Sequence, residues 1–233
     1  MSKLYEVDPE ADVLLIVPDL AEPFAPWDPV PPKPVSAPST SSPYASLFSN
    51  RLLVHSGLTR GVVAAAAPET GLRIKVSSKH LGLASTTLKS RLQFADAPNE
   101  ADGRVHLRLE GVDPTAVKIV LDAVHGRGRR VPKSVDVETL AKIAVFVDRF
   151  QLHEAVEVYA DRWIGQLEQS VPATYNRDLI LWIYITYVFR QGDLFKAATK
   201  VAITQSTEPI RSLGLPIREK ITSMLPHLPS LEC

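Results

Sequence analysis

The chain of 233 residues contains a single cysteine, Cys233, which is also its last residue. One thiol cannot form an intramolecular disulfide, and it cannot assemble a cysteine-based zinc site. This scarcity of cysteine is typical of a reducing compartment. We therefore expect an intracellular protein, cytoplasmic or nuclear.

Long apolar runs are also lacking. The longest one, residues 179–189, has eleven residues between Asp178 and Arg190, whereas a membrane-spanning helix needs about 20. It predicts a buried helix. The first apolar run, residues 13–17, is too short for the apolar part of a secretory signal. We expect no membrane segment and no export.

No charge of one sign dominates, because 26 Lys+Arg residues balance 26 Asp+Glu residues. Neutrality, without a polycationic segment, argues against a protein that coats nucleic acid or a membrane surface. With 45% hydrophobic residues, the composition is that of an ordinary globular protein.

Patterns typical of catalysis or cofactor binding are equally scarce. The six histidines show neither H-x-x-x-H nor H-E-x-x-H spacing, and we interpret His80 and His153 as helix-packing residues. Gly126-Arg127-Gly128 follows a predicted helix rather than a strand, which argues against a dinucleotide site. We predict that the chain is not an enzyme and has no metal and no cofactor.

Two charge clusters have competing interpretations. Four cations within residues 127–133 could contact phosphate or an acidic partner, but no aromatic side chains interleave them, so a solvated turn is favoured. Three carboxylates within residues 154–161 lie on successive helical turns, which is typical of a solvent-facing stripe.

Proline is concentrated in one place: nine of the 19 prolines fall within residues 18–43. Proline lacks a backbone donor and has a fixed φ, so it favours extended structure over a packed core. We predict a disordered insertion at residues 21–70, with residues 19–45 dispensable for folding. A semi-rigid spacer is favoured over a PxxP ligand for an aromatic groove. Residues 44–69 receive no assignment.

Alternating apolar and polar residues predict strands at 72–76 and 105–109, beside the apolar strand at 13–17. Between them, residues 78–83 favour a short helix, and Ser85 is suited to cap a second one.

The rest of the chain predicts helices. Asp113 followed by Pro114 is a strong start signal for a helix that ends at residues 125–126. Amphipathic helices follow from residue 136 and over residues 152–163. Later helices are predicted at 175–190, 193–204 and 216–225. The predicted core side chains are Leu88, Leu121, Ile143, Val147, Tyr159 and Trp163.

Several stretches share the pattern of one known family. They are Asp12 to Val17, Lys79-His80-Leu81 through Ser85, His125-Gly126-Arg127, residues 135–156 and Asp178 to Ile183. With the order of the elements, they resemble the BTB/POZ domain in the form abundant in filamentous fungi. A typical domain of this family joins its first two strands by a tight turn, whereas more than fifty residues intervene here.

The resemblance implies an α+β fold with a small, mainly three-stranded sheet and a helical cluster, extended by C-terminal helices. Residues 1–20 would supply the first strand and residues 71–168 the BTB-like core. Residues 169–233 would form a helical extension packed on that core.

The resemblance also implies a noncatalytic protein–protein interaction module that self-associates, as a homodimer, or docks a partner. Alternatives are a substrate adaptor for a cullin-type ubiquitin ligase, a transcription-associated adaptor and, least favoured, an unrecognised hydrolase. Because a long insertion separates residues 13–17 from their partner strand, we expect an exposed edge open to strand addition. The predicted interaction surface consists of Val13, Leu15, Val17, His80, Leu81 and Leu83.

Overall fold

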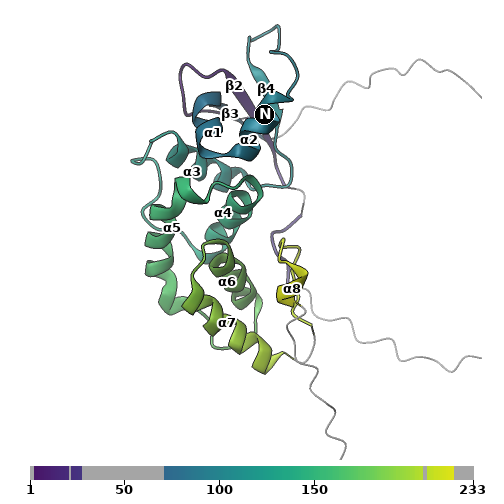
Figure 1. The fold of residues 1–233 in the computed structure, drawn as a ribbon, viewed down its shortest axis with the longest axis vertical. Helices are drawn as coiled ribbons and strands as arrows, with labels where there is room; N and C mark the ends of the chain where they lie inside the picture. Colours follow the sequence, from purple (N-terminus) through teal and green to yellow (C-terminus); the bar gives the residue numbers. More distant parts are fainter. Residues whose placement is uncertain (1–2, 21, 28–70, 207–208, 223–233) are drawn as a thin grey trace, which may run out of the picture. The chain divides into compact units, whose positions relative to one another are not determined.

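The computed structural model describes residues 3–20, 22–27, 71–206 and 209–222, which combine a small β-sheet with a set of α-helices (Figure 1). The strands are β1 (Lys3–Glu6), β2 (Val13–Pro18), β3 (Gly71–Val76) and β4 (Val105–Arg108). The helices are α1 (Ser78–Ala84), α2 (Thr86–Gln93), α3 (Pro114–Val124), α4 (Val137–Phe150), α5 (His153–Leu167), the 3-10 helix η1 (Glu168–Ser170), α6 (Arg177–Val188), α7 (Gly192–Gln205) and α8 (Glu219–Thr222). The predicted α+β class is confirmed.

The strands form one mixed sheet with the order β1-β3-β2-β4. β2 runs antiparallel to β3, from Val13 opposite Val76 to Pro18 opposite Gly71. β1 is parallel to β3, and β4 is parallel to β2. A Cβ atom on Gly71 would lie 2.6 Å from the carbonyl oxygen of Val17, so this close approach requires glycine. The sequence analysis predicted a mainly three-stranded sheet, whereas the described sheet has four strands. The additional strand is β1, which was not predicted.

The apolar strand β2 lies inside the sheet, where it pairs with β3 on one side and with β4 on the other. The insertion between β2 and β3 does not prevent their pairing, because its two ends, Pro18 and Gly71, lie opposite each other. The expectation that residues 13–17 offer a free edge is therefore wrong. Among the described strands, the edges belong to β1 and β4.

Polar caps determine where helices begin. The Oδ1 atom of Asp113 accepts hydrogen bonds from the backbone N–H groups two and three residues later, each at 2.9 Å, and Pro114 occupies the first turn of α3. The Oγ atom of Ser85 accepts from the backbone N–H of Leu88 at 2.9 Å and caps α2. Both predicted helix starts are confirmed, since each rests on short-range side-chain chemistry.

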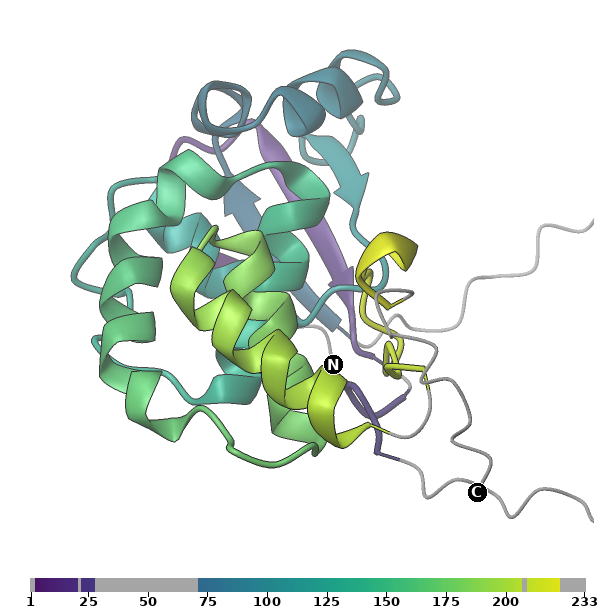
Figure 2. The same cartoon turned by 60° about the horizontal axis from the view of Figure 1, so that its bottom comes forward.

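Helix α6 lies at the centre of the helical part, where it packs against α4 and α7. Figure 2 shows this end of the molecule with α7 in front. Every side chain from Leu179 to Ile185 is fully buried, as expected of the long apolar run. One continuous cluster of buried residues joins the sheet to α3, α4 and α6, so the C-terminal helices share a core with the residues before them.

The structure places the predicted core side chains in this cluster. Leu88, Leu121, Ile143, Val147 and Trp163 are each 1% exposed or less, and Tyr159 is partly buried against them. The Nε1 atom of Trp163 donates a hydrogen bond to the carbonyl oxygen of Pro132 at 2.9 Å. The loop before α4 is thereby held against α5.

Packed residues continue past the predicted boundary at residue 20. Ala25 is 5% exposed, and Phe24 contacts the same core. Part of the stretch predicted to be dispensable, residues 19–45, is thus ordered against the helices, because Phe24, Ala25 and Trp27 supply apolar surface among the prolines. The rest of the insertion, residues 28–70, lies outside the described residues, as do residues 223–225 of the last predicted helix.

Candidate interaction surface

The structure separates the six residues of the predicted interaction surface into two groups. Val13, Leu15 and Val17 are at most 1% exposed, because they belong to the central strand β2, and Leu81 is fully buried. These four are core residues, which corrects the prediction. His80 and Leu83 remain on the surface, and the side chain of Leu83 is 89% exposed. The accessible part of the predicted surface therefore lies on α1.

Helix α1 is tied to the loop before β2 through Asp12. The Oδ1 atom of Asp12 accepts a hydrogen bond from the backbone N–H of Ser78 at 2.7 Å, and Oδ2 accepts one from the Ser78 hydroxyl. Partial burial raises the pKa of Asp12, but these two hydrogen bonds, a hydrogen bond from its own backbone and the nearby Lys79 charge together leave the pKa below its ordinary value. An ionised carboxylate at this helix start also suits the helix dipole.

A histidine pair supports α1 from α3. The rings of His80 and His125 are stacked, with centroids 4.8 Å apart. The backbone N–H of Ser77 donates to Nε2 of His125 at 3.1 Å. Nδ1 of the same ring lies 2.8 Å from the carbonyl oxygen of Leu121. Only the neutral tautomer with its proton on Nδ1 makes both hydrogen bonds.

Helix α2 is attached to the end of α4. The hydroxyl of Ser85 donates to the carbonyl oxygen of Phe150, and the guanidinium of Arg91 lies 5.2 Å from the Phe150 ring centroid. Both α1 and α2 are thus held by contacts with the body of the domain, so the side chains that they present to solvent have defined positions.

Two large apolar side chains project from this helix pair. Leu83 precedes α2, and Phe94, which is 86% exposed, follows its last residue. Helix α2, whose eight residues have a length of about 12 Å, lies between them in the chain. Three exposed cations, Lys79, Lys89 and Arg91, lie on the same two helices.

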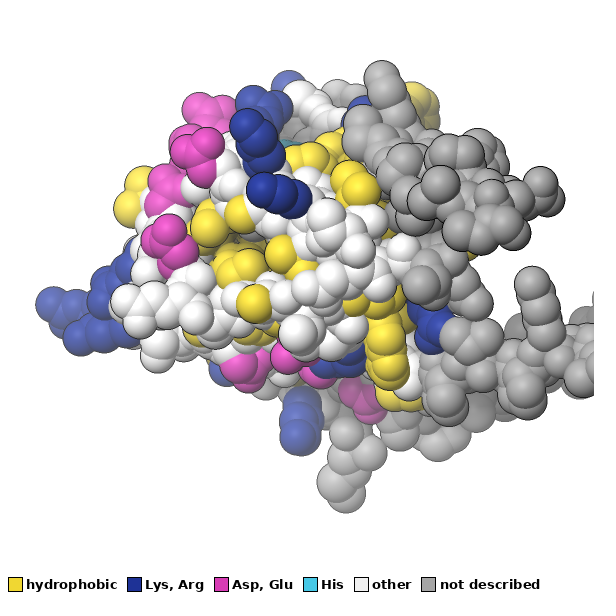
Figure 3. Space-filling model, turned by 90° about the horizontal axis from the view of Figure 1, so that it is seen from below, with side chains coloured by type: hydrophobic (Ala, Val, Ile, Leu, Met, Phe, Trp, Pro, Cys, Tyr) yellow, Lys and Arg dark blue, Asp and Glu magenta, His cyan; other side chains and the backbone are white. Residues whose placement is uncertain are grey.

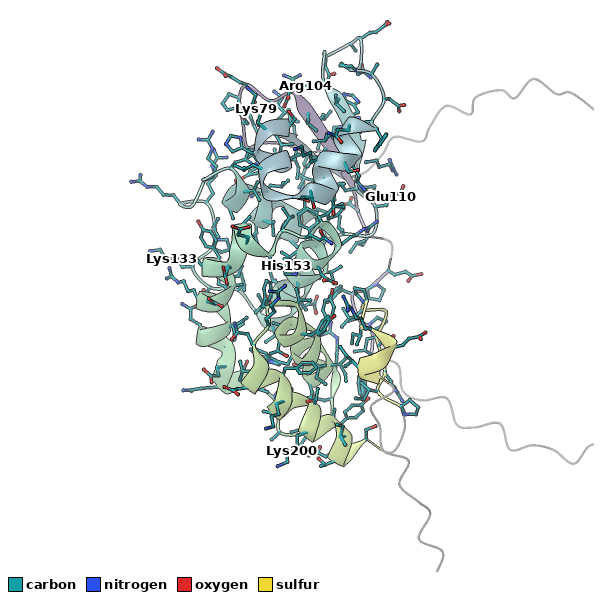
Figure 4. All side chains as sticks on the ribbon, in the orientation of Figure 1. Lys79, Arg104, Glu110, Lys133, His153 and Lys200 are labelled. Atoms are coloured by element: carbon teal, nitrogen blue, oxygen red, sulfur yellow. The ribbon has the colours of Figure 1, made fainter. Side chains whose placement is uncertain are left out.

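No Asp or Glu occurs between Ser78 and Phe94. Lys79, His80, Leu83, Lys89, Arg91 and Phe94 are called the α1–α2 surface below. Figure 4 places Lys79 on α1, at the opposite end of the domain from Lys200 on α7. Phe94 was missed in the sequence; its only signal is an aromatic residue just after a predicted helix, which does not distinguish a buried ring from an exposed one.

Apart from the α1–α2 surface, the structure has a recess between α5 and the turn from α6 to α7. A cavity of about 440 Å³ there is lined by residues that include His153, Glu154, Glu157, Asp161 and Arg190. The three carboxylates are exposed, as predicted, and they also line this recess. Figure 3 views the helical end of the domain, where apolar side chains gather in the middle and charged ones lie around the margin.

The Asp148 carboxylate contacts both His153, which lines this recess, and Tyr184. Nε2 of His153 lies 3.9 Å from a carboxylate oxygen of Asp148, and the Tyr184 hydroxyl lies 3.5 Å from the other one. Burial raises the pKa of Tyr184, and the neighbouring Asp148 carboxylate raises it further. Tyr184 therefore remains a protonated donor at neutral pH.

The described histidines contact carboxylates, the backbone or each other. His106 contacts the Asp102 carboxylate, and His153 lies near Asp148. His80 and His125 stack on each other, and His125 also bonds to the backbone. Within the described ranges, no group of three or more His, Cys, Asp or Glu residues is arranged to hold a metal ion.

The basic cluster after α3 contacts the N-terminal strand. Nε of Arg127 donates to the carbonyl oxygen of Val7 at 3.1 Å, and Nη1 of Arg130 donates to that of Glu6 at 3.0 Å. The turn is exposed, as predicted, but two of its arginines have a structural role that the sequence did not indicate. Lys133 projects from the same loop (Figure 4).

Among the helices that the structure describes, none combines the length and the apolar character needed to cross a membrane. The chain matches no protein-family model and no curated protein sequence.

Proposed function

We propose that this chain is a noncatalytic protein-interaction module that docks a partner through the α1–α2 surface. The observation that carries the proposal is the exposure of Leu83 and Phe94, at 89% and 86%, on a helix pair that carries cations and no carboxylate. The partner that fits is an acidic segment with two apolar side chains spaced to reach both residues.

Physical arguments support a protein partner for this surface. Burying a large apolar side chain contributes roughly 1.5–3 kcal/mol, so Leu83 and Phe94 could act as anchors. The cations on the same two helices would steer an acidic partner and accelerate its association. Because α1 and α2 are fixed to β2, α3 and α4, little ordering cost arises when a partner binds.

The charge of the surface favours a heterotypic partner over a second copy. A symmetric dimer built on this surface would place Lys79, Lys89 and Arg91 against themselves, since both subunits contribute the same patch. Self-association through another face, the homodimer that the BTB/POZ resemblance implies, stays a second proposal.

Three further functions were considered: two kinds of adaptor and a hydrolase. A cullin-type ligase adaptor and a transcription-associated adaptor both rest on the BTB/POZ resemblance, and both are compatible with a docking surface. A hydrolase would need a nucleophile beside one of the histidines, and the described rings contact carboxylates, the backbone or each other instead.

The test compares two exposed apolar positions. Leu83→Ser and Phe94→Ser, alone and combined, are each used as bait in a native extract, with Val158→Ser as the matched control because Val158 is 80% exposed on α5. We expect the wild type and the control to capture the same acidic partner, and the double variant to lose it.

Circular dichroism checks that every variant is folded. Charge reversal at Lys89 and Arg91 should weaken the same partner more strongly at low salt, because screening removes the contribution of surface charges. A partner that binds the folded double variant as well as it binds the wild type would contradict the proposal. Purified protein that captures no specific partner would contradict it as well.

A further inference from the structure

Residues 22–27 are held against the domain by an arginine that recognises their backbone. Nε of Arg177 donates a hydrogen bond to the carbonyl oxygen of Ala25 at 2.8 Å, and Nη2 donates one to that of Phe24 at 2.9 Å. The same Nη2 lies 2.7 Å from Oε2 of Glu138. Arg177 begins α6 and Glu138 lies in the first turn of α4, so the guanidinium is fixed between two helix starts.

Side-chain contacts flank this backbone clamp. The ammonium group of Lys142 lies 5.4 Å from the centroid of the Phe24 ring. The Trp27 ring meets the Tyr175 ring edge-on, with centroids 5.8 Å apart. The guanidinium of Arg211 lies 5.2 Å from the Trp27 centroid. Each of these geometries is a favourable aromatic contact.

The recognition is concentrated in a very short stretch. Ala25 is 5% exposed, while Pro23 and Pro26 are exposed on either side of the contacts. The φ angle of Ala25 is +46°, a left-handed conformation that turns the chain and directs its methyl group toward the core. Proline-containing peptides are commonly recognised in grooves lined by aromatic side chains, and here Tyr175 meets a segment with two prolines while Arg177 holds two of its carbonyl groups.

We propose that the site formed by Glu138, Lys142, Tyr175, Arg177 and Arg211 binds a short partner segment with the pattern aromatic–small–proline–aromatic. Residues 22–27 occupy this Arg177 site in cis. They hold it closed until a partner segment of the same chemistry replaces them. The Arg177 site is separate from the α1–α2 surface, and the proposal does not depend on that surface.

Tethering determines how strongly the chain's own segment competes. A short flexible connection gives a tethered ligand an effective concentration of about 1 mM. A segment whose intrinsic dissociation constant is about 0.1 mM would then close the site in roughly nine of ten molecules. A free peptide would bind the wild type about tenfold more weakly than it binds an open site.

The experiment uses the full chain and a fluorescein-labelled peptide with the sequence of residues 22–27, Glu-Pro-Phe-Ala-Pro-Trp. Fluorescence anisotropy measures its binding to the wild type and to Trp27→Ala, which weakens the cis contact at a side chain that is 38% exposed. We expect Trp27→Ala to bind the peptide more tightly, by up to about tenfold. Adding Phe24→Ala should increase the affinity further.

Two controls identify the site. Arg177→Lys in the Trp27→Ala background keeps the positive charge but loses the planar fork, and we expect it to remove binding. A peptide with both aromatic residues replaced by alanine should not bind. Circular dichroism and thermal unfolding verify that each variant is folded.

The contrary outcomes are equally specific. Absence of peptide binding to the folded Trp27→Ala variant overturns the proposal, as does equal binding of the alanine peptide or of the Arg177→Lys variant. Light scattering measures the oligomeric state and so tests whether the occupant is the segment of a second copy. A wild-type dimer that the peptide dissociates would assign the site to the segment of a second copy, and would overturn the assignment to a partner protein.

Discussion

His125 couples protonation to the start of a helix. Its neutral ring accepts the Ser77 N–H at Nε2 and donates from Nδ1 to the Leu121 carbonyl oxygen. Burial lowers the pKa of His125; the Leu121 hydrogen bond opposes this effect, and His80 lowers the pKa further. Asp8 and Arg127 also act on the ring, in opposite directions. Protonation would remove the acceptor for Ser77 and place a charge beside His80.

This residue should make stability fall on mild acidification. Above the unfolded pKa of 6.5, the ring is neutral in both states and its contribution is constant. As the pH falls below 6.5, the unfolded chain binds the proton first, so stability decreases until the folded pKa is reached and then levels off. Urea unfolding between pH 5 and 8 should show this slope, and His125→Asn should reduce it. An equal slope in both proteins would contradict the assignment.

The hydrogen bond between Tyr5 and Asp122 should also contribute to the stability of the domain. Its hydroxyl donates to the Asp122 carboxylate, with distances of 2.7 and 3.0 Å to the two oxygens, and Asp122 is only 1% exposed. Tyr5→Phe would leave a buried carboxylate without this donor, which costs about 1–3 kcal/mol. We expect thermal unfolding at a lower temperature.

Leu4→Ala is the matched control on β1, because Leu4 is 59% exposed and surface substitutions change stability by less than about 0.5 kcal/mol. Combining Tyr5→Phe with Asp122→Asn should recover part of the loss. Similar unfolding temperatures for the tyrosine and leucine variants would show that the hydrogen bond does not stabilise β1.

At the scale of elements, β2 and α1 have opposite roles although both were predicted to form one surface. Leu15 lies in the central strand and is fully buried, whereas Leu83 projects from α1 and is 89% exposed. A charged side chain at position 15 would have to be buried without a partner. Its transfer from water to the core costs far more free energy than leaving a charge exposed to solvent.

We therefore expect Leu15→Asp to prevent folding, while Leu83→Asp leaves the free energy of unfolding within about 0.5 kcal/mol of the wild type. Urea unfolding monitored by circular dichroism measures both. Partner binding is then compared for Leu83→Asp alone, since only that variant separates association from folding. A folded, stable Leu15→Asp protein would mean that β2 is not the centre of the sheet.

At the scale of the whole domain, residues 22–27 connect elements that are distant in sequence. They contact Arg177 of α6 and Lys142 of α4, and Trp27 contacts Arg211 in the C-terminal stretch. These contacts span more than 180 residues of sequence. The segment should therefore contribute to the stability of the folded domain.

Replacing residues 22–27 with a Gly/Ser sequence of equal length should lower the free energy of unfolding by about 1–3 kcal/mol, because one buried methyl group and three aromatic contacts are lost and the two backbone hydrogen bonds lose the side chains that position them. The same replacement at residues 29–34 should change it much less, since prolines and few aliphatic residues occupy that stretch. Chemical denaturation compares the two. Equal stability of both variants would contradict the packing of residues 22–27.

The sequence by itself determined the elements whose signals are local. Asp113 with Pro114, and Ser85 before α2, specify helix starts through hydrogen bonds that reach only two or three residues. Alternation over residues 72–76 specified β3, and the apolar run at 179–189 specified a buried helix. In each case, neighbouring residues carry the complete physical cause.

Only the tertiary structure decided which surfaces stay exposed. β1 has four residues and no apolar alternation, and Arg130 and Arg127, in a loop about 120 residues away, bind the carbonyl groups of its last residue and of the residue after it. β2 lost its expected free edge because β3 and β4, both distant in sequence, pair with it on either side. Ala25 is buried because Arg177 captures its carbonyl group across 152 residues. Such contacts depend on which remote segments meet in the folded chain, and local sequence patterns do not specify these long-range contacts.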